Sequence, residues 1–279
     1  MLTAGSRLAS YEILDVLGRG VSATTYRARH AKSGREVALK VPHRGSLTDS
    51  TFVVRFLQEG ALGSSLTHRS IVRVLEAGED QGLLFIAMEM VDGVPLDRRL
   101  ATEGALPLRD ALRIAHDVAE ALDFAHRKGV VHRNLKPNHV MLLAGGGVKV
   151  VDLGVARAFG DVSLTSSDVF LGAPAYAPPE ADDPHALDHR SDLYSLGIIL
   201  FEMIEGRLPF EADSMVELVR LHQERHFPTM KELARPVPRV VWNLMDRLCR
   251  KRPEDRPQSA SEAVDKLARM LAMASLDEE

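Results

Sequence analysis

The hydrophobic pattern changes its period about one third of the way along the chain, and this change limits the available folds. Before Val91-Asp92-Gly93 the apolar runs are short and β-like at 11–17, 24–29, 36–41, 71–75 and 83–90, with one helical stretch at 52–66. Afterwards helical spacing dominates at 108–126, 191–205, 214–222, 239–249 and 259–273, with short apolar runs at 140–143 and 148–151. The pattern predicts an α+β chain with a small sheet and one helix, followed by a mainly helical part.

Composition and charge limit the size of the domain, its partners and its location. The chain has 279 residues, 45% hydrophobic and 27% charged, which suits one large domain or two small lobes. A net charge of -4 gives no electrostatic reason to expect a nucleic acid or an anionic membrane as partner. The strongest apolar run, 196–201, is too short to span a bilayer. Because the single cysteine, Cys249, cannot form an internal disulfide, we expect a cytoplasmic protein without membrane insertion.

A glycine-bearing turn lies between the first predicted strands. Gly18 and Gly20 would let backbone amides approach a phosphate, although two glycines between strands are also typical of a plain hairpin. A dinucleotide site would need a helix after the turn, whereas 24–29 is β-like. The turn therefore favours a hairpin over a dinucleotide-binding loop.

One lysine ends an apolar strand. Lys40 could be a surface side chain whose stem covers apolar neighbours, or a cation aimed at phosphates. A buried cation would need an anionic partner, and Glu59 is the only acidic residue of the helical stretch 52–66. The turn, the lysine and the glutamate are together more specific than any one of them.

Further motifs follow in a fixed order. They are His132-Arg133-Asn134-Leu135-Lys136-Pro137, Asp152-Leu153-Gly154, Ala177-Pro178-Pro179-Glu180, Ser191-Asp192-Leu193-Tyr194-Ser195-Leu196-Gly197 and Arg256. In this order and spacing the chain resembles a eukaryotic-like Ser/Thr protein kinase domain of the bacterial type, over 11–271. The resemblance implies the two-lobed protein kinase fold. Residues 1–89 would form the N-lobe, with the glycine lid, strand lysine and helix, and 90–279 the C-lobe, with the catalytic loop, activation segment and helical subdomain.

The resemblance also implies ATP as ligand, with Mg²⁺ or Mn²⁺ held through Asp152. Gly18 and Gly20 would cover the phosphates, and Lys40, paired with Glu59, would hold the α- and β-phosphates. The other nucleotide-binding positions would be Leu17, Thr25, Ala38, the gatekeeper Met88, the hinge residues Glu89 and Met90, and Met141. The remaining matches carry structural or transfer roles: Lys136 would steady the transferring phosphate, Glu180 would pair with Arg256, Asp192 would brace the catalytic loop, and His132 and Arg133 belong to that loop.

The sequence departs from the family pattern at positions that serve phosphoryl transfer. Asn134 stands where the family has the catalytic aspartate, and an amide cannot take the substrate's proton at neutral pH. General-base catalysis typically contributes about 10²- to 10⁴-fold. His139 stands at the second metal-ligand position, where imidazole is a poor ligand for Mg²⁺. Ala173 replaces a threonine before the Ala177–Glu180 motif, and the lid has Ala23 for a third glycine and Thr25 for a valine.

These departures leave three interpretations. The first, which we prefer, is a pseudokinase that binds ATP and acts as a regulatory or scaffold module in phosphorylation signalling, with protein partners such as an active kinase or a phosphorylation substrate. The second is an active Ser/Thr kinase with an atypical loop, since positioning and charge matter more than proton removal. The third is a nucleotide-free protein-interaction module.

Two expectations concern individual polar residues. The loop at 161–170 contains Ser163, Thr165, Ser166 and Ser167, and we expect Thr165 or a neighbour to accept phosphate from another kinase, with Arg133 to grip it. The histidines outside the catalytic loop, including His116 and His126, are scattered, so we expect solvated or capping roles and no metal-ligand company for them.

Overall fold

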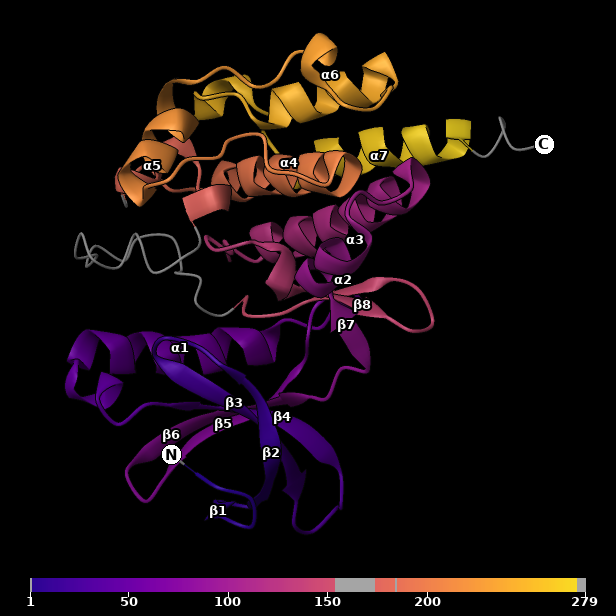
Figure 1. Ribbon diagram of the computed structural model, residues 1–279. Helices are drawn as coiled ribbons and strands as arrows, with labels where there is room; N and C mark the ends of the chain where they lie inside the picture. Colours follow the sequence, from indigo (N-terminus) through magenta and orange to yellow (C-terminus); the bar gives the residue numbers. More distant parts are fainter. Residues whose placement is uncertain (1, 154–173, 184, 275–279) are drawn as a thin grey trace.

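Six strands form one antiparallel sheet in the N-terminal part of the chain, as the computed structural model shows for the described residues 2–153, 174–183 and 185–274 (Figure 1). The strands are β1 (Arg7–Leu8), β2 (Tyr11–Arg19), β3 (Ala23–His30), β4 (Glu36–Pro42), β5 (Val74–Asp80) and β6 (Leu83–Glu89). Their order in the sheet is β1-β2-β3-β4-β6-β5. Alternation along β4 buries Val37, Leu39 and Val41 in one core cluster. Ala38 and Lys40 therefore face the opposite side of the sheet.

Helix α1 (Ser50–Ser65) covers that opposite side and lies toward the helical part of the molecule (Figure 1). Its N-terminus is capped by Asp49, whose side chain accepts a hydrogen bond from the backbone amide of Thr51. Gly60 allows the helix to approach β5, because a Cβ there would lie 2.4 Å from the Cβ of Ala77. This close packing positions Glu59 over the sheet, where it is 7% exposed.

The C-terminal part is mainly helical. Its α-helices are α2 (Leu96–Glu103), α3 (Leu108–Arg127), α4 (His189–Glu205), α5 (Met215–Glu224), α6 (Arg239–Leu248) and α7 (Ala260–Ala274). Short 3₁₀ helices lie at η1 (Ser46–Thr48), η2 (Pro137–His139), η3 (Pro174–Tyr176), η4 (Pro179–Asp182), η5 (Met230–Glu232) and η6 (Pro253–Asp255). Helix α4 is buried nearly all round, and α3 packs against both α4 and α7. The core is largely aliphatic.

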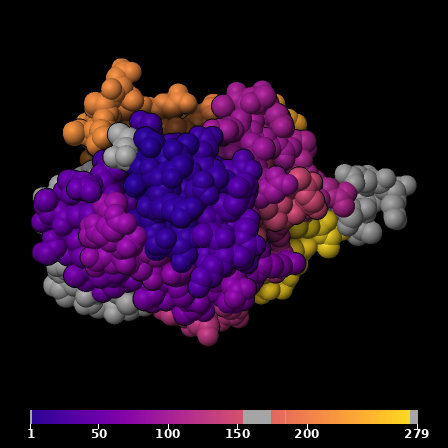
Figure 2. Space-filling model, turned by 90° about the horizontal axis from the view of Figure 1, so that it is seen from below, coloured from indigo at the N-terminus to yellow at the C-terminus, as the bar shows by residue number. Residues whose placement is uncertain are grey.

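A second, smaller sheet lies where the two parts meet. It contains β7 (Gly93–Pro95), β8 (Val140–Leu143) and β9 (Val148–Val150), all antiparallel. Val150 donates to the carbonyl of Ser70, and Val72 donates to the carbonyl of Val150, so the segment before β5 is tied to β9. Seen from the N-terminal sheet, that sheet and α1 cover much of the helical part behind them (Figure 2).

The structure confirms the protein kinase fold, with an antiparallel-sheet N-lobe and a helical C-lobe, and differs from the sequence-based expectations at four elements. The strand expected at 71–75 corresponds to β5, which starts later, at Val74, and runs to Asp80, while Ile71 forms an isolated bridge with Val150. Helix α2 was not predicted, since only Leu96 and Leu100 are buried in it. Strands β1 and β7 were too short to give a pattern. None of the described helices is long and apolar enough to cross a membrane.

Candidate functional site

Three charged side chains from distant parts of the chain meet between the lobes. Lys40 of β4 places its Nζ 2.7 Å from Oε1 of Glu59 on α1 and 3.1 Å from Oδ1 of Asp152, which follows β9. The side chain of Lys40 is 13% exposed and that of Glu59 is 9% exposed. One ammonium is therefore shared by two carboxylates in a region with little solvent. When all three side chains are ionised, the group carries one excess negative charge.

The electrostatics of this group follow from its geometry. Burial alone would lower the pKa of Lys40, but the carboxylates of Asp152 and Glu59 outweigh it and raise that pKa. Burial raises the pKa of Glu59 despite its contact with Lys40. Partial burial would raise the pKa of Asp152, yet the Lys40 ammonium holds the pKa of its carboxyl below the usual range. Asp152 is therefore the anion of the group that stays ionised most firmly.

The loop that carries Asn134 is anchored by Asp192 of α4. The carboxylate of Asp192 accepts hydrogen bonds from the backbone amides of His132 and Arg133, each at 2.7 Å. Arg133 has a positive φ of 62°, a conformation that costs free energy and persists only where neighbours fix it. Because the backbone amide of Arg133 donates to Asp192, this carboxylate helps to fix the strained conformation of Arg133.

His126, at the end of α3, completes this anchor and was missed by the sequence-based reasoning. Its Nε2 lies 2.8 Å from Oδ2 of Asp192, and its side chain is 8% exposed. The expectation of a solvated or capping role for this histidine is wrong. Its only sequence signal is its place on the same helix as the buried stripe of α3, because its partner lies 66 residues further along the chain.

His139 extends from η2 toward Asp152. Its Nδ1 lies 2.9 Å from the backbone oxygen of Asn134, and its Nε2 lies 3.5 Å from Oδ2 of Asp152. Its ring stacks on that of His132, with 5.6 Å between the ring centroids and 11° between the planes. Burial lowers the pKa of His139 to about 3, so the imidazole is neutral at physiological pH.

The metal that kinases use fits only part of this arrangement. The carboxylate of Asp152 is a hard oxygen donor of the kind that Mg²⁺ prefers. His139 offers a neutral imidazole nitrogen instead, and Mg²⁺ accepts such a donor poorly. Lys136, which is half-buried, lies close enough to Asp152 to feel its charge, although burial is the larger influence and lowers the pKa of Lys136.

The residues expected to contact a nucleotide come mainly from β2, β3, β4, β6 and β8. Ala38 of β4 is the cross-strand partner of Met88 on β6. Thr25 on β3 pairs with Gly18 on one side and with Lys40 on the other. Of the remaining expected residues, Gly20 donates to the carbonyl of Ala23 at 2.9 Å and closes the lid turn, Leu17 is 43% exposed, Met90 is 36% exposed and Met141 lies on β8.

Glu89, an expected hinge residue, has its side chain engaged in the structure. It forms an ion pair with Lys149 of β9 and accepts a hydrogen bond from the backbone amide of Arg73 at 2.9 Å. Its carboxylate thus ties the end of β6 to the small sheet, and its backbone amide donates to the carbonyl of Arg73.

Glu180 and Arg256 form a bidentate pair below the site. The two guanidinium nitrogens of Arg256 lie 2.7 and 2.6 Å from Oε1 and Oε2 of Glu180. The Arg256 side chain is fully buried and its guanidinium lies 5.0 Å from the ring centroid of Tyr194. Ser191 donates a further hydrogen bond to Glu180. Thr165 and Ala173, by contrast, lie outside the described residues.

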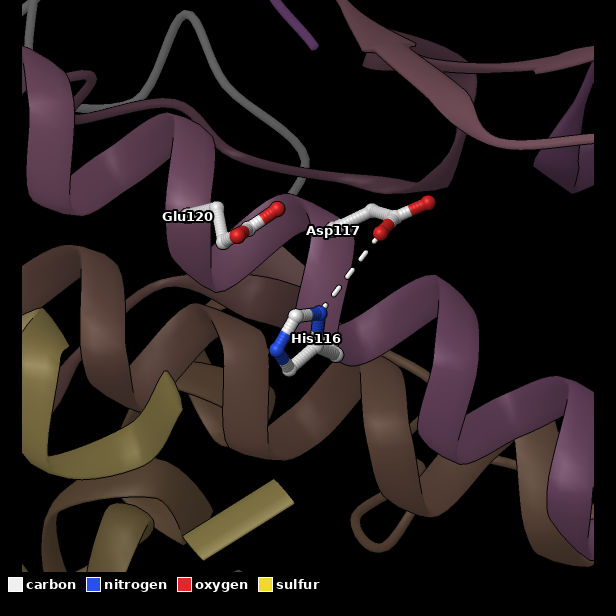
Figure 3. A group of neighbouring side chains, drawn as sticks. All are labelled: His116, Asp117 and Glu120. Carbon is white, nitrogen blue, oxygen red and sulfur yellow. Dashed lines mark ion pairs between the residues drawn. The ribbon is translucent and has the colours of Figure 1, made fainter. Parts of the chain in front are cut away.

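A second cluster of candidate ligands lies on α3. His116, Asp117 and Glu120 place one ligand atom each within 4.8 Å of the others (Figure 3). This corrects the expectation that His116 has no such company. These side chains already interact with other residues of the protein: Nδ1 of His116 lies 3.6 Å from a carboxylate oxygen of Asp117, and Glu120 forms an ion pair with Arg69. The cluster lies on α3, outside the group formed by Lys40, Glu59 and Asp152.

Known proteins match this chain in both sequence and fold. The protein kinase domain family matches residues 11–267. The chain is 34% identical over 259 residues to the serine/threonine-protein kinase PrkC of Bacillus subtilis, covering 92% of this chain and 40% of that protein. It is 38% identical over 281 residues to PksC of Streptomyces coelicolor, covering 96% of this chain and 50% of that protein. A crystal structure of a mutant PknI kinase domain from Mycobacterium tuberculosis superimposes with a TM-score of 0.76 at 26% identity, covering 96% of this chain and 98% of that one.

The two-lobed fold and the lysine shared by carboxylates from α1 and the segment after β9 define a protein kinase domain. The chain belongs to the protein kinase family, as a domain of the eukaryotic-like Ser/Thr type found in bacteria. It spans about 40% of the length of PrkC.

Proposed function

We propose that this domain binds ATP and acts as a regulatory or scaffold module in phosphorylation signalling, with phosphoryl transfer slow or lost. The observation that carries the proposal is the position of His139, whose Nε2 faces Oδ2 of Asp152 at 3.5 Å. In the family pattern an asparagine at this place would hold the second metal. A neutral imidazole there, together with an amide at Asn134, removes both the metal ligand and the proton acceptor.

Retention of nucleotide binding is supported by the group on the other side of Asp152. Lys40 is held by Glu59 at 2.7 Å, in the position from which the family's lysine contacts the α- and β-phosphates. We propose that Gly18 and Gly20 cover the phosphates of ATP. The adenine would lie among Leu17, Thr25, Ala38, Met88, the hinge backbone at 89–90, and Met141.

The remaining residues of the site support the loop. Asp192 and His126 hold the backbone at His132 and Arg133, and the Glu180–Arg256 pair fixes the segment after the activation region. Lys136 would contact the terminal phosphate. We further propose a cytoplasmic location, and a protein partner that is an active kinase or a phosphorylation substrate.

Thr165 is our proposed acceptor of phosphate from such a kinase. Arg133 lies in the loop that Asp192 holds, and a guanidinium there would pair with a phosphate. Intact-mass spectrometry after incubation with an active Ser/Thr kinase checks this step. Phosphate at Thr165 that Thr165→Ala removes would support it, and an unmodified mass would contradict it.

Binding and transfer are tested separately. A thermal-shift series with ATP, with and without divalent metal, measures binding, and labelled-phosphate transfer to the protein itself and to a basic protein measures activity. Lys40→Met is the control for both. The double variant Asn134→Asp with His139→Asn should raise transfer by about 10²-fold or more, since it returns the base and the oxygen ligand.

Two alternatives have specific support. An active kinase with an atypical loop is favoured by the retained Lys136 and Asp152, and Lys40-dependent transfer by the natural sequence would establish it. A nucleotide-free interaction module is favoured by Ala23 and Thr25 in the lid. The absence of any thermal shift at millimolar ATP, with the protein folded, would establish that alternative.

A further inference from the structure

The protonation of the His139 ring is fixed by its hydrogen bond to the backbone. Nδ1 lies 2.9 Å from the carbonyl oxygen of Asn134, and a carbonyl oxygen can only accept. Nδ1 therefore carries the proton, and the lone pair of the neutral ring is on Nε2. In metal-ligating histidines one ring nitrogen usually binds the metal, while the N–H of the other nitrogen donates a hydrogen bond to a group such as a backbone carbonyl. His139 has this arrangement.

That lone pair faces a carboxylate oxygen. Nε2 of His139 lies 3.5 Å from Oδ2 of Asp152, whereas Lys40 contacts Oδ1, so the two oxygens of Asp152 have different neighbours. Two acceptors that face each other repel, and a cation between them converts the repulsion into attraction. The carboxylates of Glu59 and Asp152 also outnumber the single ammonium of Lys40, which favours an added cation.

The separation of the two donor atoms identifies the kind of ion. Donors at about 2.0–2.2 Å from a tetrahedral Zn²⁺ are about 3.3–3.5 Å apart. Neighbouring donors at about 2.0–2.1 Å from an octahedral Mg²⁺ are about 2.8–3.0 Å apart. The 3.5 Å between Nε2 and Oδ2 matches the tetrahedral value. Nitrogen with oxygen is likewise a donor set that suits zinc-like ions better than Mg²⁺.

The backbone holds both ligands in place before any ion arrives. The amide of His139 donates to the carbonyl of Lys136, and the amide of Val151 donates to the carbonyl of His139, both at 2.9 Å. The second bond joins the residue next to Asp152 directly to His139. The stacked ring of His132 supports the imidazole from one face. This rigidity lowers the cost of assembling a site.

We propose that Nε2 of His139 and Oδ2 of Asp152 bind a divalent ion of the zinc class in place of Mg²⁺. The pair supplies two ligands, and a nucleotide phosphate oxygen and water would complete the coordination. The inference rests on the proposed function only for that phosphate. The domain would thus have exchanged the metal preference of its family through one substitution on η2.

Co²⁺ is the probe, because it replaces zinc in tetrahedral sites and reports its geometry through visible absorption. The unmodified full chain should develop tetrahedral Co²⁺ bands with one equivalent of metal, in the presence of a non-hydrolysable ATP analogue, and Zn²⁺ should displace them. Thermal shifts with Zn²⁺ or Co²⁺ should exceed those with Mg²⁺. Loss of either ligand should weaken Co²⁺ binding by about 10- to 100-fold or more.

Three variants make the assignment specific. His139→Asn and Asp152→Asn should abolish the bands, and His139→Asn should in addition gain a response to Mg²⁺. His116→Asn, in the other cluster of candidate ligands, is the matched control and should keep the bands. Equal shifts with Mg²⁺ and Co²⁺ in the natural sequence, or bands that survive both ligand variants or vanish in His116→Asn, would overturn the inference.

Two separate measurements distinguish the two proposals: the thermal shift caused by the nucleotide analogue in EDTA, and the Co²⁺ spectrum in a sample without EDTA. A thermal shift in EDTA, combined with no Co²⁺ spectrum in the other sample, would retain nucleotide binding and reject the metal site. A Co²⁺ spectrum with no nucleotide shift would retain the metal site and reject nucleotide binding.

Discussion

Lys40 of β4 and Glu59 of α1 form an ion pair of 2.7 Å, and Asp152 shares the same ammonium at 3.1 Å. The pair joins the sheet to its helix, and the third member joins both to the segment after β9. Because the Glu59 side chain is only 9% exposed, removal of Lys40 would leave a buried carboxylate without its cation, whereas removal of Glu59 would leave Lys40 paired with Asp152. The proposed nucleotide binding and the stability of the fold would therefore depend on the same residues.

Lys40→Met should lower the free energy of unfolding by about 3–5 kcal/mol, because two carboxylates lose the cation that they share. Urea unfolding followed by circular dichroism measures the change. The control is Arg27→Met, which breaks a surface pair with Glu36 whose side chains are 48% and 31% exposed. That change should cost about 1 kcal/mol or less. Equal losses in the two variants would show that the Lys40 group contributes no special stability.

Gly60→Ala should destabilise the domain although alanine is the better helix former. The new Cβ would lie 2.4 Å from the Cβ of Ala77 on β5, so α1 would have to move away from the sheet and carry Glu59 with it. We expect a loss of about 1–3 kcal/mol, beyond the gain of about 1 kcal/mol from helix propensity. The melting temperature and the nucleotide-induced shift of that temperature should both fall.

The matched control for Gly60 is Gly45→Ala, where an added Cβ meets no atom within 4 Å. Its melting temperature should change little. The compensating variant Gly60→Ala with Ala77→Gly returns the space and should recover the nucleotide-induced shift. If the double variant stays as weak as Gly60→Ala alone, steric contact with β5 is not the cause.

The motifs from Lys40 to Arg256 were enough to predict the fold, because their order along the chain fits one two-lobed architecture. The pairing of Lys40 with Glu59 was also accessible, since 52–66 holds no other acidic residue and the structure places the two side chains together. Short or polar elements gave no such signal. Helix α2 buries only Leu96 and Leu100, and one apolar pair defines no period.

The parts of the site that sequence could not supply depend on tertiary hydrogen bonds. His126 and Asp192 lie 66 residues apart, and nothing local marks them as partners. The identity of His139 was clear from its place in the motif, but the direction of its lone pair follows only from the bond between Nδ1 and the carbonyl of Asn134. Geometry of this kind decides what ion a site can hold.

Arg256→Lys should destabilise the C-lobe although it conserves the charge. Lysine cannot reproduce the paired bonds of 2.7 and 2.6 Å to Glu180, nor lie flat against Tyr194. We expect a loss of about 2 kcal/mol or more in urea unfolding, the scale of a lost charge-assisted hydrogen bond with its partner left buried. Arg252→Lys, at a pair whose side chains are 72% and 54% exposed, is the control and should be nearly neutral. A similar loss in both would remove the argument from bidentate geometry.

Asp192 should make the stability of the domain fall in acid. Burial alone would raise the pKa of its carboxyl, but the hydrogen bond and charge of His126, with the backbone amide of His132, hold that pKa below its ordinary value of about 3.9. A group with a depressed folded-state pKa contributes its full stability above the unfolded pKa and loses it as pH falls toward the folded one. Asp192 thus stabilises the fold above about pH 4 and progressively less below it.

The variant Asp192→Asn removes this titration, so its free energy of unfolding should fall less steeply than that of the natural sequence as pH drops below about 4. Asp213→Asn, at an exposed position before α5, is the control and should retain the natural slope. Urea unfolding at a series of pH values gives the slopes directly. Parallel curves for Asp192→Asn and the natural sequence would mean that the anchor of the catalytic loop does not depend on an ionised carboxylate.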